Sequence, residues 1–511
     1  MSENSANTKR IAKNTAMLYF RMILIMAVSL YTTRIVLKQL GVEDFGIYNV
    51  VGGVVTMLAF LSSSMSSATQ RFLSFELGKK DIPQLSRVFG MSVNIQIVIA
   101  LGVLFIAETL GLWFVNTQLT IPGDRLIAAN WVYQFSILTF IVSIISVPYN
   151  AAILTYEKMN VFAYISILEV VLKLLAVFML EWFGFDKLKL YAILIFAVSL
   201  IIRVIYGVYV KRNIKDCNYS FFWDKKLFLT LINFAGWNLW GNVAVVTYNQ
   251  GINIMLNIFF GPVVNAARAI AFQVNAAFNS FISNFQMALK PQIIKSYAVD
   301  DHKYVQSLIF SGAKYSYFLM MLLCIPMILS TPQILNWWLG TVPEYTVIFC
   351  RLVLVESLIN SISGTLMSGA QASGKIKVYQ GVVGGLLLLI LPISYVFLYF
   401  GSPPEVTLYI SICIVLSALI ARLFILSPIL SFSKSGFFKE VLLPIIFISF
   451  LITGVGLLIV QFAEKSFFNL ILANLTLLTI MIFLIFFIGF GNKERMLVKV
   501  KFLELKNNFK K

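Results

Sequence analysis

Long apolar runs alternate with short polar segments along the whole chain. A membrane-spanning helix needs about 20 mainly apolar residues. Runs of that kind lie at 14–38, 45–74, 88–116, 126–154, 161–183, 190–210, 230–259, 264–289, 307–331, 346–370, 378–400, 406–428, 441–461 and 469–489. Turn-forming clusters such as Pro122-Gly123-Asp124 separate them. The pattern predicts an all-α polytopic membrane protein with about 14 transmembrane helices.

The lysines and arginines between the runs indicate the orientation. If the N-terminus is inside the cell, the cytoplasmic segments hold 26 basic residues and the outer segments hold five. Cytoplasmic loops of membrane proteins carry an excess of Lys and Arg, so this split predicts that both termini are cytoplasmic. Residues 1–13 are then a cytoplasmic N-terminus, and residues 490–511 are a basic cytoplasmic tail.

The composition excludes several classes of protein. Hydrophobic residues make up 59% of the chain and charged residues 12%, whereas soluble domains are about 25% charged. The net charge of +18 follows from the cytoplasmic loops and does not indicate a nucleic-acid partner. The single histidine, His302, excludes a histidine metal site and a Ser-His-Asp triad. Residues 369–375 spell most of a phosphate-binding loop, but Ile376 stands where that loop needs Ser or Thr. We therefore expect no enzyme, no cofactor and no metal site.

An internal repeat relates the two halves of the chain. At shifts of 217 to 220 residues the sequence sets Lys80-Asp81 on Asp300-Asp301, Tyr156–Phe162 on Ser373–Tyr379, and Arg203 on Arg422. The matched runs lie six apart, and because six is even both halves enter the membrane from the same side. Parallel repeats of this kind are typical of transporters whose binding site lies between the halves. The sequence therefore predicts one six-helix bundle over 14–226, a second over 227–440 and an extra helix pair over 441–489.

Charged residues inside the runs indicate what the membrane interior accommodates. A charge at the bilayer centre costs about 2.5–3.5 kcal/mol on insertion scales, so it should face a cavity or a partner. The acids are Glu108, Glu169, Glu181 and Glu356. The basic residues are Arg21, Arg34, Arg71, Lys173, Arg203, Arg268, Lys314, Arg351 and Arg422. This excess of positive charge favours an anionic substrate and disfavours an organic cation.

Several of these charges are candidate site residues, and each has a plainer alternative. Arg21 lies about seven residues into the first run, and Arg34 lies near its outer end, where a long side chain can instead reach the headgroups. Lys173 follows Glu169 by four residues on one helical face, so a substrate contact and a closed ion pair both remain open. Glu356 has no basic residue three or four positions away. Glu356 and Glu169 are candidates for ion coupling, and a permanently neutral, hydrogen-bonded acid is the alternative for Glu356.

Two stripes of polar residues follow adjacent runs of the second half. Residues three, four or seven positions apart share a helical face. Such stripes either join two helices by hydrogen bonds or line a hydrated cavity that accommodates sugars. The first stripe is Asn238, Asn242, Asn249, Asn253 and Asn257, and the second is Arg268, Asn275, Asn279, Ser283 and Gln286.

Two motifs of the first half resemble those of a known superfamily. Leu40–Tyr48 reads LGVEDFGIY, and Ala68–Asp81 reads ATQRFLSFELGKKD. With the two parallel six-helix bundles, these residues resemble the MATE/oligosaccharide-flippase (MOP) superfamily over roughly residues 10–490. Within it, the chain is most similar to Wzx-type flippases, which move undecaprenyl-pyrophosphate-linked oligosaccharides for O-antigen or capsular polysaccharide.

The resemblance implies a flippase that moves a polyprenyl-pyrophosphate-linked oligosaccharide across the bacterial cytoplasmic (inner) membrane by alternating access. Its expected partners are this lipid-linked oligosaccharide, membrane lipids and polysaccharide polymerase machinery, and coupling to a proton or sodium gradient is left open. Arg21 and Lys173 would bind the pyrophosphate from the cytoplasmic side, and Arg34 and Arg268 would bind it from the outer side. The asparagine stripes would replace the water around the sugars, and residues 441–489 would line a groove for the polyprenyl tail. A MATE-type multidrug/cation antiporter and a non-transporting scaffold are the alternatives.

Overall fold

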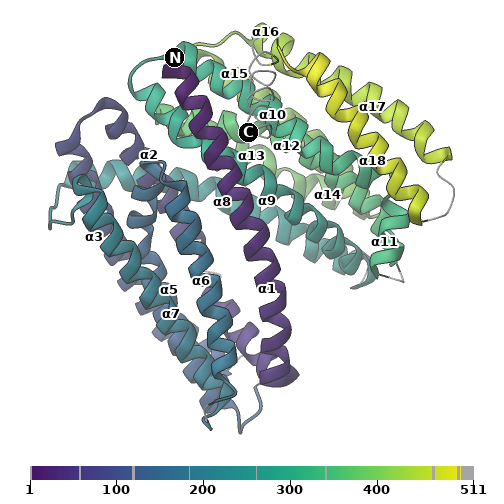
Figure 1. Ribbon diagram of the computed structural model, residues 1–511. Coiled ribbons are helices and arrows are strands. Elements are labelled where there is room, and N and C mark those ends of the chain that lie inside the picture. The colour runs from purple at the N-terminus through teal and green to yellow at the C-terminus, as the bar shows by residue number, and fades with distance from the viewer. Residues whose placement is uncertain are drawn as a thin grey trace, which may run out of the picture. The chain divides into compact units, whose positions relative to one another are not determined.

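The computed structural model describes residues 3–56, 59–117, 121–182, 184–260, 262–339, 342–462, 467–491 and residue 495. Within these ranges the chain forms helices and short connections, without a strand (Figure 1). Among the described residues, eleven helices are long and apolar enough to cross a membrane. The chain is therefore a multi-pass membrane protein, while the count of fourteen spans and the orientation stay predictions.

The helices follow the predicted runs, each of which overlaps at least one helix. The bounds are α1 (Glu3–Thr56), α2 (Ala59–Lys79), α3 (Ile82–Ile106), η1 (Ala107–Gly111), α4 (Leu112–Thr117), α5 (Leu126–Thr155), α6 (Met159–Met179), α7 (Lys187–Asn213), η2 (Lys215–Cys217), α8 (Lys225–Phe260), α9 (Pro262–Ala298), α10 (His302–Leu329), α11 (Thr331–Leu339), α12 (Thr346–Ser373), α13 (Ile376–Leu388), α14 (Ile390–Tyr399), α15 (Val406–Ile429), α16 (Lys434–Phe437), η3 (Phe438–Leu442), α17 (Leu443–Phe462), α18 (Phe467–Leu484) and η4 (Ile485–Gly489). The short helix α11 was not expected from the apolar pattern.

A bend at Gly41 divides α1 into two helices. Gly41 has φ 79° and ψ 171°, a conformation that is essentially restricted to glycine. The LGVEDFGIY motif therefore marks the bend between the first two predicted runs. Just beyond it, Asp44 pairs with Arg125, whose Nη1 also lies 2.8 Å from Oδ2 of Asp186 at the start of α7. This ion-pair cluster ties α1 to the first residues of α5 and α7.

A turn of π-helix interrupts the run that the sequence predicts as one uninterrupted helix over 88–116. The helix passes from α3 through η1 into α4, and within it Leu112 N donates to Ala107 O in the i→i+5 pattern of a π-helix. The hydroxyl of Tyr133 on α5 donates to the carbonyl of Ala107 at 2.7 Å. A Cβ at Gly111 would overlap that hydroxyl. Tyr133 and Gly111 therefore fit one another and stabilise the π-turn.

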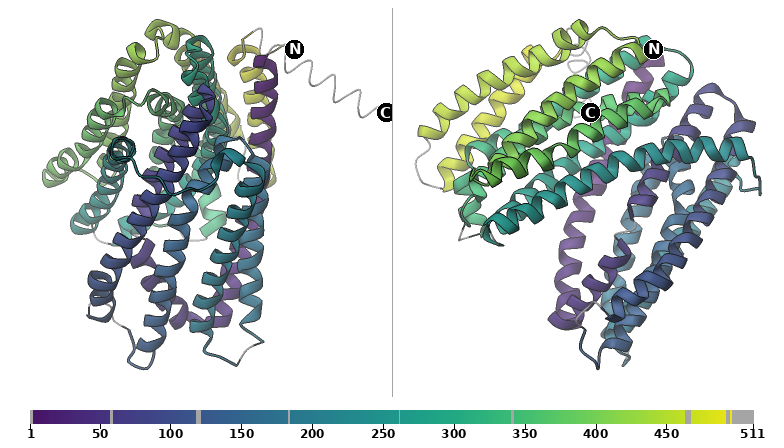
Figure 2. Two further views of the ribbon diagram at one scale, coloured as in Figure 1. Left: turned by 90° about the vertical axis from the view of Figure 1, so that its left-hand side faces the viewer. Right: turned by 180° about the vertical axis from the view of Figure 1, so that it is seen from behind.

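The described chain forms two compact units, and each is considered by itself. The first comprises Met1–Val243, Met287–Asp301 and Gln371–Gln380, and the second comprises Ala244–Gln286, His302–Ala370 and Gly381–Lys511. In the first unit α5 packs against α1, α2, α3 and α7 (Figure 2). In the second unit α17 and α18 lie side by side and pack on α10.

The backbone repeats itself at the predicted shifts. After α2, Asp81 N donates to Glu76 O while Lys80 has φ 59°; after α9, Asp301 N donates to Ser296 O while Asp300 has φ 57°. These are the same left-handed helix endings, and they lie 220 residues apart. Glu157 with φ 56° and Gly374 with φ 73° correspond in the same way at a shift of 217. The matching endings agree with the predicted shifts, while the division into two six-helix bundles stays a prediction.

Candidate functional site

A partly open cavity of about 470 Å³, with both polar and apolar lining, lies in the first unit. It could hold about 15 water molecules at about 30 Å³ each. Four helices line it, and the lining combines a carboxylate, an ammonium, hydroxyls and aromatic rings. The lining residues are Tyr48, Gly52 and Val55 of α1, Phe135, Ser136, Thr139, Phe140 and Ser143 of α5, Glu169 and Lys173 of α6, and Ala192, Ile195 and Ser199 of α7.

Glu169 and Lys173 form an ion pair on the wall of this cavity. Lys173 Nζ lies 2.6 Å from Glu169 Oε1, and the two side chains are 42% (Lys173) and 36% (Glu169) exposed. The structure thus contains the closed pair that the spacing of four residues allows. Because both groups also face the cavity, the pair is accessible to a ligand, so the closed pair and the substrate contact do not exclude one another.

Arg21 on α1 brings a second positive charge to the same carboxylate. Arg21 is absent from the cavity lining, but its guanidinium interacts electrostatically with Glu169 and Tyr206. It lies 4.5 Å from the centre of the Phe162 ring. Its Nε and Nη1 are buried and have no hydrogen-bond partner among the described residues. Buried donors of this kind call for a water or a ligand, and two cations against one carboxylate leave the cluster net positive.

Two hydroxyls of the cavity, those of Thr139 and Ser199, are arranged to accept hydrogen bonds. Thr139 Oγ1 donates to Phe135 O and Ser199 Oγ donates to Phe196 O, both at 2.7 Å. Because each of these two hydroxyls donates its hydrogen to a carbonyl of its own helix, its oxygen remains available to accept a hydrogen bond from a ligand. The rings of Phe135, Phe140 and Tyr48 supply apolar faces beside these oxygens. Such a lining suits a ligand rich in hydroxyl groups.

A second cluster surrounds Arg268 in the second unit. Arg268 Nε donates to Asn253 Oδ1 at 2.8 Å, and Nη2 donates to Asn249 Oδ1 at 3.2 Å. The guanidinium also lies 4.1 Å from the centre of the Phe272 ring. Two members of the first asparagine stripe therefore orient Arg268, which begins the second stripe. These hydrogen bonds join α8 to α9.

Glu356 on α12 has a basic neighbour that sequence reasoning missed. Its carboxylate interacts electrostatically with Arg268 of α9, and Asn360 Nδ2 lies 3.5 Å from its Oε1. The sequence predicted that Glu356 has no basic partner, because only positions on its own helix were considered. That prediction is wrong, since Arg268 of another helix lies near Glu356. Glu356 and Arg268 belong to one buried polar cluster.

The other asparagines make hydrogen bonds within the protein. Asn279 Nδ2 donates to Asn275 Oδ1 at 2.7 Å, and both residues contact Ser357 of α12. Asn242, in the first unit, donates to Ser64 Oγ of α2 at 3.2 Å. These bonds join neighbouring helices, as the plainer interpretation of the stripes expects. The side chains of Arg34 and Asn257 lie outside the described residues.

A third cluster, around Glu157, was not predicted. The carboxylate of Glu157 accepts hydrogen bonds from Gln292 Nε2 at 2.8 Å and from Lys295 Nζ at 2.6 Å. In the position related by the repeat, Arg71 at the end of α2 donates to the carbonyls of Gln371 and Ala372 at 3.2 and 3.3 Å. Glu157 thus joins the α5–α6 loop to α9, and Arg71 joins α2 to the last residues of α12, both inside the first unit. Glu157 lies beside Lys158 in a loop that the sequence predicts to be cytoplasmic, and this acid was the signal that could have revealed the cluster.

The comparisons with known proteins identify the fold. No protein-family model matches the sequence, and no curated protein matches it. An outward-facing multidrug-resistance MATE-family transporter of the MOP superfamily matches with a TM-score of 0.69 and 13% identity, over 82% of this chain and 96% of that one. MATE in the straight conformation matches with a TM-score of 0.71 and 11% identity, over 83% and 97%.

A third structure is a MOP-superfamily transporter from Pyrococcus furiosus, reported with a binding pocket of reverse polarity that suggests a different function. It matches with a TM-score of 0.69 and 12% identity, over 82% of this chain and 96% of that one. At these identities the comparisons show that the chain has the fold of MATE transporters of the MOP superfamily.

Proposed function

We propose that this protein is a flippase that moves a polyprenyl-pyrophosphate-linked oligosaccharide across the cytoplasmic membrane by alternating access. One observation supports this most strongly: the first unit contains a cavity with a net positive cluster beside it. Arg21 and Lys173 outnumber Glu169, and two guanidinium nitrogens of Arg21 are buried without a partner among the described residues. A phosphate would satisfy such donors through charge-assisted hydrogen bonds.

The lining supports a glycan beside the phosphate. The accepting hydroxyls of Thr139 and Ser199 and the apolar faces of Phe135 and Phe140 match the alternating hydroxyl and C–H surfaces of a sugar. A hydrophobic multidrug pocket would not need this many hydroxyls. The fold adds support because it is shared with transporters, one of which is reported with a pocket of reverse polarity.

Each charged cluster has a proposed role in this cycle. Arg21 and Lys173 bind the pyrophosphate when the substrate enters from the cytoplasm. Arg268, held by Asn249 and Asn253, binds it in the second unit, and Arg34 is the candidate for the outer side of the first unit. The paired helices α17 and α18, which carry no charge between Leu443 and Gln461 or between Asn469 and Gly489, hold the polyprenyl tail.

A MATE-type cation antiporter is the second candidate. The observation that favours it is the carboxylate of Glu169 on the cavity wall, because a cation exchanger needs a membrane acid. The ion pair with Lys173 at 2.6 Å opposes it, since the ammonium already neutralises that acid. A drug-resistance assay in a pump-deficient strain tests this alternative directly.

The flippase is tested by polysaccharide display in a host that lacks its own flippase. Arg21→Ala and Lys173→Ala each remove a charge-assisted contact worth about 1.5–3 kcal/mol, which corresponds to a loss of flux of roughly tenfold to a hundredfold. Arg21→Lys should retain part of the flux because phosphate accepts a point charge. Lys439→Ala, at an exposed position, is the matched control. Normal display from both alanine variants at normal membrane levels would refute the anionic site, and drug resistance without display would favour the antiporter.

A further inference from the structure

The loop between α7 and α8, residues 214–224, is fixed to the surface of α3. Ser86 Oγ donates to the carbonyl of Asp216 at 2.6 Å, and Asn94 Nδ2 donates to the carbonyl of Phe222 at 2.7 Å. The hydroxyl of Tyr219 donates back to Asn94 Oδ1 at 2.9 Å. Side chains of α3 thus satisfy the loop backbone at two separate points, so the loop has a defined position.

These contacts follow α3 toward the membrane. Between Ser86 and Asn94 the helix rises about 12 Å, at 1.5 Å per residue. Between them lies Gly90, where a Cβ would stand 2.9 Å from the carbonyl of Ser220. The missing side chain permits this close approach of the loop backbone. The α7–α8 loop therefore folds back along α3 and does not extend into the cytoplasm.

The length of the helix places the loop at headgroup depth. From Ile82 to Thr117 the helix has 36 residues, which is about 54 Å against a hydrocarbon core of about 30 Å. If the excess is shared equally by the two ends, about eight residues at each end lie outside the core. The core then begins near Gly90, in the middle of the loop contacts. On this division the loop lies at the boundary between hydrocarbon and headgroups.

At this depth the loop exposes three aromatic side chains. Tyr219 is 45% exposed, Phe221 79% and Trp223 50%. Aromatic residues are enriched at the interface of a bilayer, where an apolar ring can reach the acyl chains beside polar headgroups. An ordered loop that presents three such rings to the outside has the chemistry of a lipid-facing surface.

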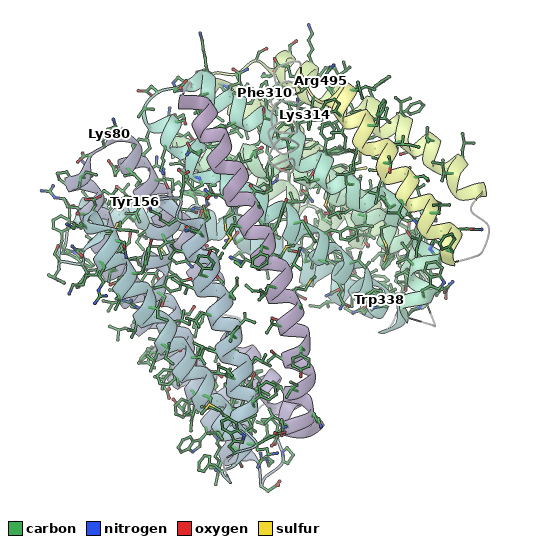
Figure 3. All side chains as sticks on the ribbon, viewed as in Figure 1. Lys80, Tyr156, Phe310, Lys314, Trp338 and Arg495 are labelled. Atoms are coloured by element: carbon green, nitrogen blue, oxygen red, sulfur yellow. The ribbon has the colours of Figure 1, made fainter. Side chains whose placement is uncertain are left out.

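Six exposed basic residues lie on this loop, on the helix ends beside it and on α3, and the loop also holds two acids, Asp216 and Asp224. Asp216 accepts the hydroxyl of Tyr156 at 2.6 Å, and Asp224 caps α8 by accepting from Lys226 N at 2.7 Å. Lys80 and Tyr156 lie toward the same end of the first unit (Figure 3). The six basic residues outnumber the two acids, so the surface carries a net positive charge. Its basic residues are Arg87, Lys211, Arg212, Lys215, Lys225 and Lys226.

We propose that the α7–α8 loop and its flanking residues, 211–226 with Arg87, form a binding surface for anionic phospholipid headgroups of the cytoplasmic leaflet. The aromatic rings enter the boundary of the acyl chains, and the basic side chains bind the phosphates. Clusters of four or more basic residues beside a transmembrane helix bind anionic lipids in this way. The surface is distinct from the cavity of the first unit, so the inference is independent of the proposed transport.

The first test measures thermal unfolding of the purified full-length protein while phosphatidylglycerol or phosphatidylcholine is added. The wild type should be stabilised at lower concentrations of phosphatidylglycerol. Replacing Lys211, Arg212, Lys225 and Lys226 together by Gln should raise the phosphatidylglycerol concentration for half the effect by at least about tenfold. Lys187→Gln/Lys189→Gln, at the other end of α7, is the matched control. An unchanged response of the fourfold variant would overturn the proposal.

The second test locates the loop without relying on stability. Phe221→Cys, in a background where the exposed Cys413 is replaced by Ser, is labelled with a polarity-sensitive fluorophore in phosphatidylglycerol vesicles. Lipids that carry a quencher in the headgroup region should quench it, and an aqueous quencher should not. Val299→Cys, at the end of α9 and 55% exposed, is the water-exposed control. If the aqueous quencher reaches both labels equally, the surface faces water and the proposal fails, in favour of an acidic protein partner.

Discussion

Glu157 holds together two segments of the first unit that come from opposite halves of the repeat. Its side chain is 1% exposed and accepts hydrogen bonds from Gln292 and Lys295 at the end of α9. Close by, Gly78 at the end of α2 lies against the same end of α9, where a Cβ would stand 2.7 Å from the carbonyl of Lys295. If the protein works by alternating access and opens at this end, which is predicted to be cytoplasmic, these contacts must separate.

Glu157→Gln removes the charge of this contact and keeps its shape. A hydrogen bond to a charged group contributes about 1.5–3 kcal/mol. The side chain of Lys295 is 20% exposed, so the freed ammonium can return to water and a value of about 2 kcal/mol is appropriate. At about 1.4 kcal/mol per factor of ten, the ratio of separated to closed contacts should rise about 30-fold.

The rate of thiol labelling at position 67 measures this ratio. Ser67 Oγ lies 3.3 Å from Lys290 Nζ, so Ser67→Cys, in a background with Cys413→Ser, is covered while α2 and α9 are in contact. A maleimide added on the cytoplasmic side should label it faster when Glu157→Gln is present. Gly78→Ala should have the same effect by a different route, because its methyl group would meet the backbone of α9.

The matched control is Glu440→Gln, the same change at an exposed position. Unchanged labelling in both Glu157→Gln and Gly78→Ala, together with a lower unfolding temperature, would refute the reasoning. The cluster would then stabilise the fold without separating during transport.

Three further predictions concern other parts of the structure. Gly111→Ala should destabilise the protein by about 1–3 kcal/mol, because the added methyl group meets the Tyr133 hydroxyl. Tyr133→Phe removes that hydroxyl and should restore part of the lost stability. A double-mutant cycle measured by calorimetry that shows no coupling between the two positions would contradict this. Burial opposes ionisation of Asp186, but the hydrogen bonds from Arg125 and from the start of α7 outweigh it and lower the pKa of Asp186 below its ordinary 3.8. Its charged contacts therefore add stability above about pH 4 that is lost as the pH falls through the lowered pKa. Arg125→Ala should lower the free energy of unfolding by about 1.5 kcal/mol at pH 6. In thermal unfolding, the difference in stability between this variant and the wild type should shrink below pH 3.8. A difference that stays constant with pH would exclude Asp186 as its source. Glu356→Gln should abolish the dependence of transport on an ion gradient, because the amide can neither release a proton nor hold a cation beside Arg268; full gradient-dependent transport by this variant would exclude the residue from coupling.

The sequence determined the helices because the bilayer leaves so little choice. A backbone in hydrocarbon must satisfy its own hydrogen bonds, and a run of about 20 apolar residues does so only as a helix. The pair of Glu169 and Lys173 was predictable for a related reason: a spacing of four residues on one helix sets their distance. The matching endings at Lys80 and Asp300 lie at the predicted shift of 220 residues, since such endings depend on local backbone geometry.

Only the tertiary structure decided which charges meet. Glu356 lies near Arg268 of another helix, Arg125 joins Asp44 and Asp186, and Glu157 contacts Lys295 across 138 residues. Helical periodicity specifies the face on which a side chain lies, but it leaves open the partner helix, its rotation and its depth. Those are set by the packing of whole helices, such as the fit of Tyr133 beside Gly111. A buried charge needs a partner for electrostatic reasons, and the position of that partner along another helix follows only from this packing.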